Sequence, residues 1–379
     1  MPKRPGVYVR VPEGYSAFVP DPLPPQLVWS DPLLNALSDA DRAIGRLAGE
    51  GRRLPNPHAL MRPFITREAV LSSRIEGTQA TLGELLAAEA GAIVDRSPED
   101  LQEVSNYVAA LEYGIQRLNA LPLSLRLVRE VHAKLLQGVQ GESAQPGRFR
   151  RSQNWIGTPG STLQTATYVA PPPGKMTACL EALEGFLQDR SLPPLAQIAL
   201  SHYQFEAIHP FLDGNGRVGR LLVVLFLVER GILPTPLLYL SAFFEATRRD
   251  YYDRLLAVTE RGEWEAWLLY FLNGIARQSE DAVDRAMRIT ALVDRWQGRL
   301  AGIGTKAPSL LAERLAANPY LTAKVAAQNL GVAFTTADRA IRRLVDEGIL
   351  TPIGDGRRGR AYCAKAILSI LEEPAKLTP

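Results

Sequence analysis

The chain has 379 residues, of which 46% are hydrophobic, and this length favours two or three domains with a sizeable core. Its 43 basic and 40 acidic residues leave a net charge of +3, which argues against a chain that binds nucleic acid along its whole length. Two distant cysteines, Cys179 and Cys363, argue against a disulfide framework or a cysteine-ligated metal. The longest apolar run, 221–228, is too short to cross a bilayer, so we expect a cytoplasmic protein without membrane contact.

The elements are expected in the following order. Residues 1–30 are rich in proline and predict an extended arm or short strands, and 30–53 have helical spacing; together they form an expected N-terminal unit, 1–62. Residues 149–173 predict a β-hairpin around the turn at 158–161. Helical periodicity dominates elsewhere, in the segments 63–90, 100–118, 124–136, 175–188, 194–207, 214–230 and 247–259, followed by a pair of helices between 264 and about 303.

The composition changes after Gly302, where AGIGTKAPS reads as a linker. We therefore expect a helical domain over 63–303 and a separate domain over 304–379. Residues 348–364 predict two strands joined by a basic tip. They follow three predicted helices at 309–317, 322–330 and 334–347. Three helices followed by a basic hairpin are the outline of a winged helix-turn-helix, so the expected fold class is mainly α.

The most informative segment is 208–220, IHPFLDGNGRVGR. Gly214 and Gly216 bracket Asn215 at the start of a predicted helix. Glycines allow the backbone to turn tightly there, and the free N–H groups and positive end of the helix dipole favour an anion such as a phosphate.

Four side chains in the same segment suit phosphate chemistry. Arg217 and Arg220 are three residues apart, so they share a helix face and can reach one polyanion. Asp213 would repel phosphate unless a divalent ion such as Mg²⁺ bridged them. His209 can accept a proton at neutral pH. Each feature alone is common, but a structural role does not explain their concentration within a dozen residues.

This segment resembles the Fic signature HPFx(D/E)GNGRxxR. The signature positions are occupied by His209, Pro210, Phe211, Asp213, Gly214, Asn215, Gly216, Arg217 and Arg220. The resemblance implies a mostly helical catalytic domain with a β-hairpin flap over the target. Ile156 and Gly157 would lie in that flap.

The related Doc-type kinases resemble this family but carry Ala and Lys in place of Gly214 and Gly216. A glycine at position 216 leaves room for an α-phosphate beside His209. The resemblance therefore implies AMP transfer from ATP to a Ser, Thr or Tyr hydroxyl of a target protein, rather than phosphate transfer.

The resemblance also implies the roles that hold the triphosphate. Gly214, Asn215 and Gly216 would bind phosphate through backbone N–H groups, and Asn215 would help to fix the α-phosphate. Arg217 would bind the β-phosphate, and Arg220 the γ-phosphate.

The remaining implied roles concern the reaction and the base. His209 would deprotonate the hydroxyl that attacks the α-phosphorus, and Asp213 would hold Mg²⁺ on the α- and β-phosphates. Pyrophosphate would leave. Tyr252 and Leu255 align loosely with residues that line the adenine pocket of the family, and core packing is an equal alternative for them.

A second motif of the family, (S/T)xxxE(G/N), resembles SSRIEG here, where Ser72, Glu76 and Gly77 match. The segment would belong to an inhibitory helix at about 66–88. A carboxylate at Glu76 paired with Arg220 would occupy the place that the γ-phosphate needs. We therefore expect low basal activity and marked activation by Glu76→Gly; a reverse activity, in which Glu76 positions water to remove AMP, stays open.

The expected C-terminal module has a local basic patch. Its arginines lie on the third predicted helix, at Arg339, Arg342 and Arg343, and near the wing tip, at Arg357, Arg358 and Arg360. DNA binding and a protein-interaction role are equal alternatives for it. An N-terminal arm and a C-terminal module of this kind resemble a common bacterial Fic architecture.

Other readings stay open. The donor could be UTP or a phosphocholine nucleotide, since the signature says little about the base. A regulator that senses a nucleotide without turnover is a different class, and the intact His209 counts against it. His58, His132 and His202 are treated as structural. Self-modification and a homodimer are further expectations that the sequence does not decide.

Overall fold

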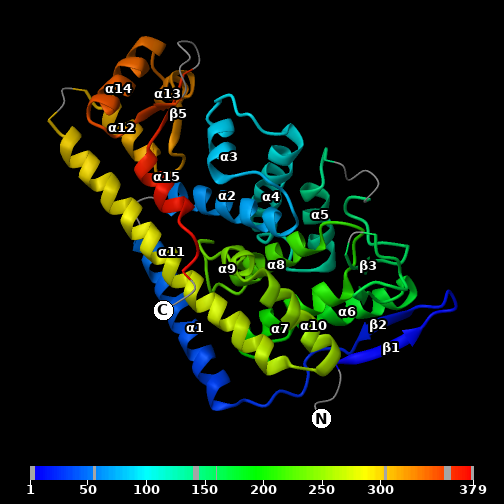
Figure 1. The fold of residues 1–379 in the computed structure, drawn as a ribbon. Helices are drawn as coiled ribbons and strands as arrows, with labels where there is room; N and C mark the ends of the chain where they lie inside the picture. The colour runs from blue at the N-terminus through cyan, green and yellow to red at the C-terminus, as the bar shows by residue number, and fades with distance from the viewer. Residues whose placement is uncertain are drawn as a thin grey trace.

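The computed structural model describes residues 5–53, 57–139, 145–158, 160–302, 305–353 and 360–376. The N-terminal arm forms the hairpin β1 (Gly6–Arg10) and β2 (Ser16–Pro20), paired antiparallel. Helix α1 (Asp31–Arg53) follows and packs along α11 (Trp264–Leu300) (Figure 1). The predicted arm with short strands and the predicted first helix are therefore confirmed.

A bundle of shorter helices fills the space on the other side of α11. It contains α2 (Pro57–Ile75), α3 (Leu82–Glu89), α4 (Pro98–Arg117), α5 (Leu125–Leu135), α6 (Pro173–Gln188), α7 (Pro194–Ile208), α8 (Asn215–Glu229), α9 (Ser241–Ala246) and α10 (Arg248–Arg261). The hairpin predicted at 149–173 is present as β3 (Trp155–Ile156) and β4 (Tyr168–Val169). Most predicted helices are confirmed to within a few residues, and the short α9 was not predicted.

The prediction of one helix over 63–90 is wrong, because a turn separates two helices there, α2 and α3. Gly77 has φ +110°, a backbone conformation that ends a helix and that residues with a side chain rarely adopt. Thr81 then starts α3 with a capping box: its hydroxyl accepts from the Glu84 N–H at 3.2 Å, and its own N–H donates to the Glu84 carboxylate at 2.8 Å. The helical spacing of apolar residues on both sides concealed this turn.

The pair of helices predicted between 264 and 303 is also wrong, since α11 is one helix of 37 residues. Gly274 lies within this helix, and a Cβ there would lie 2.7 Å from a ring carbon of Phe243. The glycine thus permits close packing and does not end the helix. Despite its length, neither α11 nor any other helix within the described ranges is long and apolar enough to cross a membrane.

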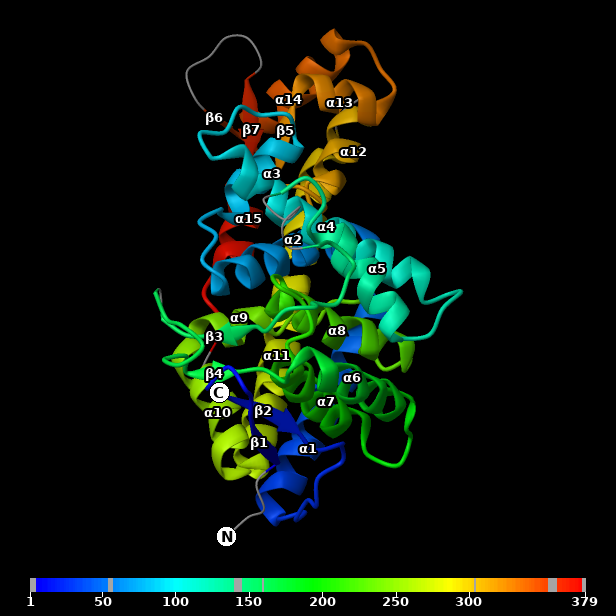
Figure 2. The ribbon, with the colours of Figure 1, turned by 90° about the vertical axis from the view of Figure 1, so that its right-hand side faces the viewer.

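The C-terminal module lies at the far end of α11, beside α3 and away from β1 and β2 (Figures 1 and 2). Its elements are α12 (Ala307–Arg314), β5 (Tyr320–Thr322), α13 (Ala323–Leu330), α14 (Phe334–Asp346), β6 (Thr351–Ile353), β7 (Ala361–Cys363) and α15 (Lys365–Glu372). The sheet order is β5-β7-β6, and all pairs are antiparallel. The three predicted helices and two strands are present; β5 and α15 were not predicted. The wing tip at 354–359 lies outside the described residues, and the winged-helix assignment stays a prediction.

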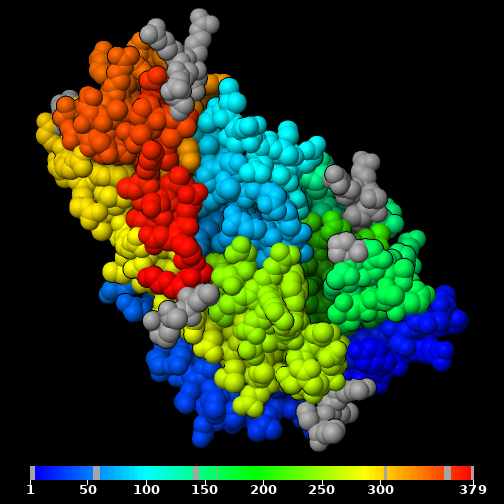
Figure 3. Space-filling view, viewed as in Figure 1, coloured from blue at the N-terminus to red at the C-terminus, as the bar shows by residue number. Residues whose placement is uncertain are grey.

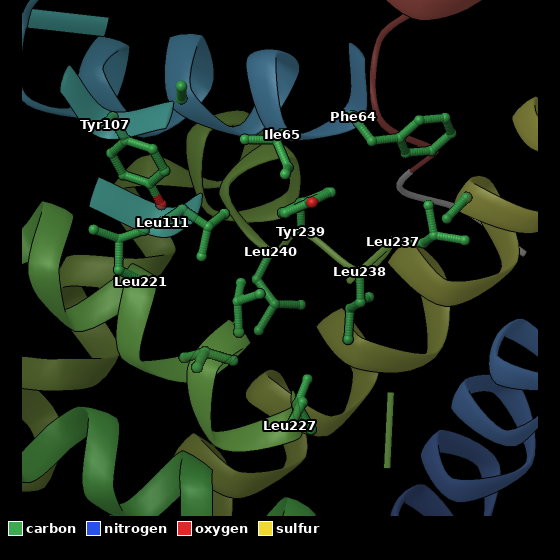
Figure 4. Close-up of a cluster of buried hydrophobic side chains, with 14 of the residues drawn as sticks. Phe64, Ile65, Tyr107, Leu111, Leu221, Leu227, Leu237, Leu238, Tyr239 and Leu240 are labelled. Carbon is green, nitrogen blue, oxygen red and sulfur yellow. The ribbon is translucent and has the colours of Figure 1, made fainter. Parts of the chain in front are cut away.

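A continuous core fixes α2 above α8. Figure 4 shows side chains of four segments pointing into one cluster. They come from α2, α4, α8 and the 237–240 segment: Phe64, Ile65, Tyr107, Leu111, Leu221, Leu227, Leu237, Leu238, Tyr239 and Leu240. Each fully buried large side chain contributes about 1.5–3 kcal/mol. This packing sets the position of α2 relative to the first turns of α8.

The last described residues return from the C-terminal module to the helical core. They form a band that runs from that module between α11 and α2 (Figure 3). Arg285 of α11, 1% exposed, pairs with Asp281 and donates to the carbonyls of Ile370, Glu373 and Pro374. Because one buried guanidinium bonds three carbonyls of this stretch, the segment is fixed to the core by more than apolar contact.

Candidate active site

Two residues in the left-handed conformation shape the loop between α7 and α8. His209 caps the end of α7 with φ 50°, and Gly214 precedes α8 with φ 77°. Among the described residues, no side chain caps the start of α8. Its first backbone N–H groups are therefore left for an anion, which the helix dipole also favours.

The Asn215 side chain stabilises this loop by hydrogen bonds to its backbone. Its Oδ1 accepts from the Phe211 N–H at 2.8 Å, and its Nδ2 donates to the Phe211 carbonyl at 2.9 Å. The residue is 3% exposed. Since the side chain is engaged inside the loop, Asn215 offers an anion its backbone N–H and not its amide group.

His132 supports the same loop, and sequence reasoning assigned it only a general structural role. Its Nδ1 accepts from the Gly147 N–H at 2.8 Å, so its Nε2 carries the proton and donates to the Asp213 carbonyl at 3.1 Å. Its ring stacks on Phe211 with centroids 3.7 Å apart. Burial lowers the pKa of His132 to about 4, so the ring stays neutral while it positions the loop.

Arg150 is a second support that sequence reasoning missed. It is 2% exposed, and its guanidinium donates to the carbonyls of His209 at 2.8 Å, Pro171 at 2.6 Å and Ser152 at 3.0 Å. These bonds join the loop to the base of the hairpin. No local pattern could indicate them, because Arg150 and His209 are 59 positions apart.

His209 has the properties of a general base. Its Nδ1 faces the Glu206 carbonyl at 3.4 Å; a carbonyl can only accept, so Nδ1 carries the proton and Nε2 is the basic nitrogen. Burial lowers the pKa of His209 to about 4, with Arg150 acting in the same direction. The imidazole is therefore neutral and able to accept a proton at pH 7.

Glu206 is a partly buried acid beside this histidine that the sequence did not single out. Its Oε1 is buried and has no hydrogen-bond partner within the described part of the chain. Burial raises the pKa of Glu206 to about 7, although Arg220 acts in the opposite direction. It lies against α8, where a Cβ on Gly219 would overlap its carboxylate.

Arg220 is bound by the segment that the sequence predicted to be inhibitory. Its Nη2 donates to Glu76 Oε1 at 2.6 Å and to the Ser72 carbonyl at 3.0 Å, and its Nε donates to Ser72 Oγ at 2.7 Å. Its side chain is 1% exposed. Burial would raise the pKa of Glu76, but the charge of Arg220 outweighs it and holds that pKa below its usual range. The predicted pair is therefore formed as a charge-assisted contact between a buried guanidinium and a Glu76 side chain that is 35% exposed.

Glu76 also fills the space beside Gly216. A Cβ on Gly216 would overlap the Glu76 carboxylate and lie 2.9 Å from Arg220 Nη1. The absence of a side chain at this position thus leaves room that the Glu76 carboxylate uses in this structure.

Arg217 has carboxylates on two sides. Its Nη1 bonds Glu103 Oε1, and its Nη2 lies 3.4 Å from Asp213 Oδ2. The Asp213 side chain is 61% exposed at the mouth of the loop, and its Oδ1 accepts from the Gly214 N–H at 2.7 Å. Over the described ranges, no group of three or more His, Cys, Asp or Glu side chains could hold a metal ion. The exposed Asp213 carboxylate is of the kind that Mg²⁺ uses in nucleotide sites together with phosphate oxygens and water.

Comparison with known proteins places these residues in a family. Residues 34–116 match the Fic/DOC family N-terminal region, and residues 122–227 match the Fic/DOC family. The chain belongs to the Fic/DOC family. Protein adenylyltransferase Fic of Drosophila grimshawi is 29% identical to this Fic protein over 216 residues, which are 55% of this chain and 40% of that protein. This chain thus spans about two fifths of the length of that relative.

Two solved structures share the fold of this Fic protein. A Fic family protein from Desulfovibrio desulfuricans G20 has a TM-score of 0.61 at 22% identity, covering 90% of this chain and 98% of that one. A Fic domain-containing signaling protein from Bacteroides thetaiotaomicron VPI-5482 has a TM-score of 0.52 at 21% identity, covering 69% and 97%. At these identities the likeness shows the Fic fold alone.

The hairpin predicted as a flap presents apolar side chains to solvent. Trp155 is 39% exposed and Ile156 is 42% exposed. A Cβ on Gly157 would lie 2.7 Å from Ser161 Oγ, so the turn requires a glycine there. Pro159, in the predicted turn, lies outside the described residues. The binding of a target by this hairpin stays a prediction.

The residues predicted to line an adenine pocket lie on α10. Tyr252 is 41% exposed and its ring centroid is 5.1 Å from that of Tyr251. Loss of water from its buried side raises the pKa of Tyr252 to about 12, and the charge of Glu76 adds to the effect. Leu255 packs partly buried against the core. A role of these residues in binding the base stays a prediction.

The predicted DNA contacts of the C-terminal module are partly engaged within the protein. Arg342 pairs with Asp338 at 2.7 Å, and Arg343 pairs with Glu347 at 2.6 Å. Arg339 is exposed on α14. The wing residues Arg357 and Arg358 lie outside the described residues. Intrahelical pairing reduces the positive field of α14, so the described part of the chain adds no support to DNA binding.

Proposed function

We propose that this Fic protein transfers AMP from ATP to a Ser, Thr or Tyr hydroxyl of a protein, itself included, and that Glu76 restrains the reaction. One observation carries the proposal: a neutral His209 stands beside the uncapped start of α8, and that helix presents Arg217 and Arg220 from its first two turns. A base, an anion site and two guanidinium groups are the parts that nucleotidyl transfer needs. The activity in the name of the Drosophila relative supports the same reaction.

The reaction would proceed as follows. His209 Nε2 takes the proton of the target hydroxyl as its oxygen bonds the α-phosphorus. The bond from that phosphorus to the oxygen bridging to the β-phosphate breaks, and pyrophosphate leaves. The backbone N–H groups at the start of α8 stabilise the charge on the α-phosphate, and Arg217 and Arg220 bind the β- and γ-phosphates.

Asp213 fits the role of a magnesium ligand. Its carboxylate is exposed at the mouth of the anion site, and Mg²⁺ in nucleotide sites uses one or two carboxylates with phosphate oxygens and water. A bound Mg²⁺ would neutralise charge on the α- and β-phosphates. Asp213 itself is oriented by the Gly214 N–H and by His132, which bonds its carbonyl.

The proposed inhibition arises because hydrogen-bond donors of Arg220 are already occupied. Ser72 and Glu76 engage its Nε and Nη2. A γ-phosphate must displace a carboxylate that a buried guanidinium holds at 2.6 Å, and an ATP that binds without this exchange has its α-phosphate out of line. We therefore expect little transfer by the wild type and strong transfer by Glu76→Gly.

The test is the intact mass of the purified protein after incubation with ATP and Mg²⁺. Wild type, Glu76→Gly and Glu76→Gly/His209→Ala are compared. We expect a gain of one or more adenylyl groups in Glu76→Gly that the His209 substitution abolishes. The same variants incubated with UTP or a phosphocholine nucleotide test the donor.

Other outcomes would change the assignment in defined ways. Modification by another nucleotide and not by ATP would contradict the donor. Loss of AMP from a premodified protein on adding wild type, abolished by Glu76→Gly, would favour the reverse reaction. No adduct with any donor, together with a specific DNA site for the C-terminal module, would favour a regulator that does not turn over.

A further inference from the structure

The phosphate-binding arginines are held by two carboxylates, one on each. Glu76 binds Arg220, and Glu103 of α4 binds Arg217 through Nη1. The second contact joins residues 114 positions apart and belongs to neither family motif described above. Thr78 Oγ1 donates to the other oxygen of Glu103, Oε2, at 2.9 Å.

We propose that Glu103 is a second inhibitory carboxylate, which occupies Arg217 as Glu76 occupies Arg220, and that Thr78 couples the two. The inference rests on the proposed function, because it concerns the access of a nucleotide to the same site. It assigns Glu103 a regulatory role that removing Glu76 alone would not cancel.

The burial of Arg217 makes this contact different from a surface ion pair. Its side chain is 4% exposed, and that of Glu103 is 23% exposed. Its Nε is buried without a hydrogen-bond partner among the described residues, and its Nη2 lies 3.4 Å from Asp213. Glu103 is thus the close partner of a nearly buried charge, in an environment where electrostatic contacts are stronger than in water.

Binding a phosphate at Arg217 costs free energy while Glu103 keeps its present position. Either the phosphate displaces Glu103 from Nη1, or both anions bind one guanidinium and repel each other at close range. Glu76 imposes the same choice at Arg220. The two arginines are three residues apart on α8, so one triphosphate must meet both carboxylates.

Thr78 links Glu103 to the turn that carries Glu76. The N–H groups of Glu76 and Thr78 both donate to the Ser73 carbonyl, at 3.0 and 3.1 Å, and Gly77 lies between them with φ +110°. Because one carbonyl anchors both residues, a movement that takes Glu76 from Arg220 also moves Thr78 and its bond to Glu103. Release at one arginine therefore favours release at the other.

An alternative role for Glu103 is to orient Arg217 for catalysis, and it predicts the opposite result. A positioning residue would lower kcat or nucleotide affinity when removed. An inhibitory residue would raise the affinity. The two roles are separated by measuring binding and turnover in the same variants.

The experiment is a calorimetric titration of Mg·ATP into Glu76→Gly/His209→Ala, which cannot turn over, with and without Glu103→Gln. We expect Glu103→Gln to tighten binding about tenfold, on the order of one charge-assisted hydrogen bond. Thr78→Val should tighten it less, and Thr78→Ser should leave it unchanged. Glu112→Gln is the matched control, since Glu112 lies on the same helix and pairs with the exposed Arg62 at 3.0 Å.

Each outcome decides the inference. If Glu103→Gln does not fold, Thr78→Val carries the same test with the charge in place. Equal or weaker binding with Glu103→Gln, or a fall in kcat in the Glu76→Gly background, would overturn the inhibitory role while leaving the proposed function intact. No binding of ATP to any variant, Glu76→Gly/His209→Ala included, would contradict the proposed function and this inference together.

Discussion

His209 differs from a surface histidine in both its backbone and its ring. Its left-handed backbone ends α7 and starts the loop, and Arg150 bonds its carbonyl at 2.8 Å. The residue is partly buried, and this burial lowers the pKa of His209 to about 4. A base with this pKa is a weak one, but it is in its reactive form throughout the neutral range.

We therefore expect the transfer rate of Glu76→Gly to be nearly constant as the pH falls from about 8 to about 5.5, because a lowered pKa keeps the imidazole neutral well below its usual value of 6.5. Removing Glu76 does not reverse this shift. The negative charge of Glu76 raises the pKa of His209, so its loss lowers that pKa further. The measurement is kcat at saturating ATP across this range. A rate that halves near pH 6.5 would mean that His209 titrates at its usual pKa.

The sequence could predict residues whose partners are near them in the chain. His209, Asp213, Arg217 and Arg220 lie in one segment, so their spacing indicated one site. Glu103 could not be predicted, because its contact with Arg217 depends on how α4 packs against α8 and leaves no periodic signal. The contact of Glu76 with Arg220 joins residues 144 positions apart, and only the resemblance to a family motif indicated it.

At the scale of elements, the break between α2 and α3 determines where Glu76 lies. Glu76 follows directly after the end of α2, in a turn closed by two bonds to the Ser73 carbonyl. A helix continuing through Gly77 would carry the following residues in another direction, and Thr78 would not reach Glu103. The sequence predicted a continuous helix because the spacing of apolar residues is helical on both sides of a single glycine.

We expect Gly77→Ala to raise self-modification several-fold. No atom lies within 4 Å of a Cβ built on Gly77, so the substitution causes no clash. It acts through the backbone, because Gly77 has φ +110° and a residue with a side chain costs about 1–2 kcal/mol in such a conformation. That strain disfavours the turn that presents Glu76. The readout is the initial rate of adenylyl incorporation.

Gly91→Ala is the matched control for this change. Gly91 also has a positive φ, +77°, but lies beyond α3 and away from the turn. It should lower stability without raising the rate. A Gly77→Ala protein as inactive as wild type would mean that the turn tolerates the strain and that core packing alone holds Glu76.

At the scale of the whole molecule, the helical core and the C-terminal module are joined by buried polar contacts. Arg285 and Asp281 are 1% and 3% exposed at their side chains, and the guanidinium holds three carbonyls of the returning chain. Asn318 and Thr322 of the module donate to the carbonyls of Leu86 and Ala90 in and after α3. The core and the module should therefore unfold together.

We expect Arg285→Met to lower the free energy of unfolding by about 3–5 kcal/mol, because it leaves a buried Asp281 carboxylate without its partner. Arg288→Met is the control: Arg288 pairs with Glu373, both side chains are more than a third exposed, and the loss should stay below about 1 kcal/mol. Urea unfolding measures both. Two separate transitions in wild type would contradict the expected coupling of core and module.

The stretch that docks on α2 is synthesised long after α2 itself. Arg67 of α2 donates to the carbonyl of Glu373, which is 306 positions later in the chain. A ribosome therefore completes Glu76, His209 and Arg220 long before it makes the stretch that fixes α2 from outside. Until that stretch emerges, α2 lacks the bond from Arg67 to Glu373, and Arg285 lacks its three carbonyl partners, so the helix that leads into Glu76 is held only by its other contacts.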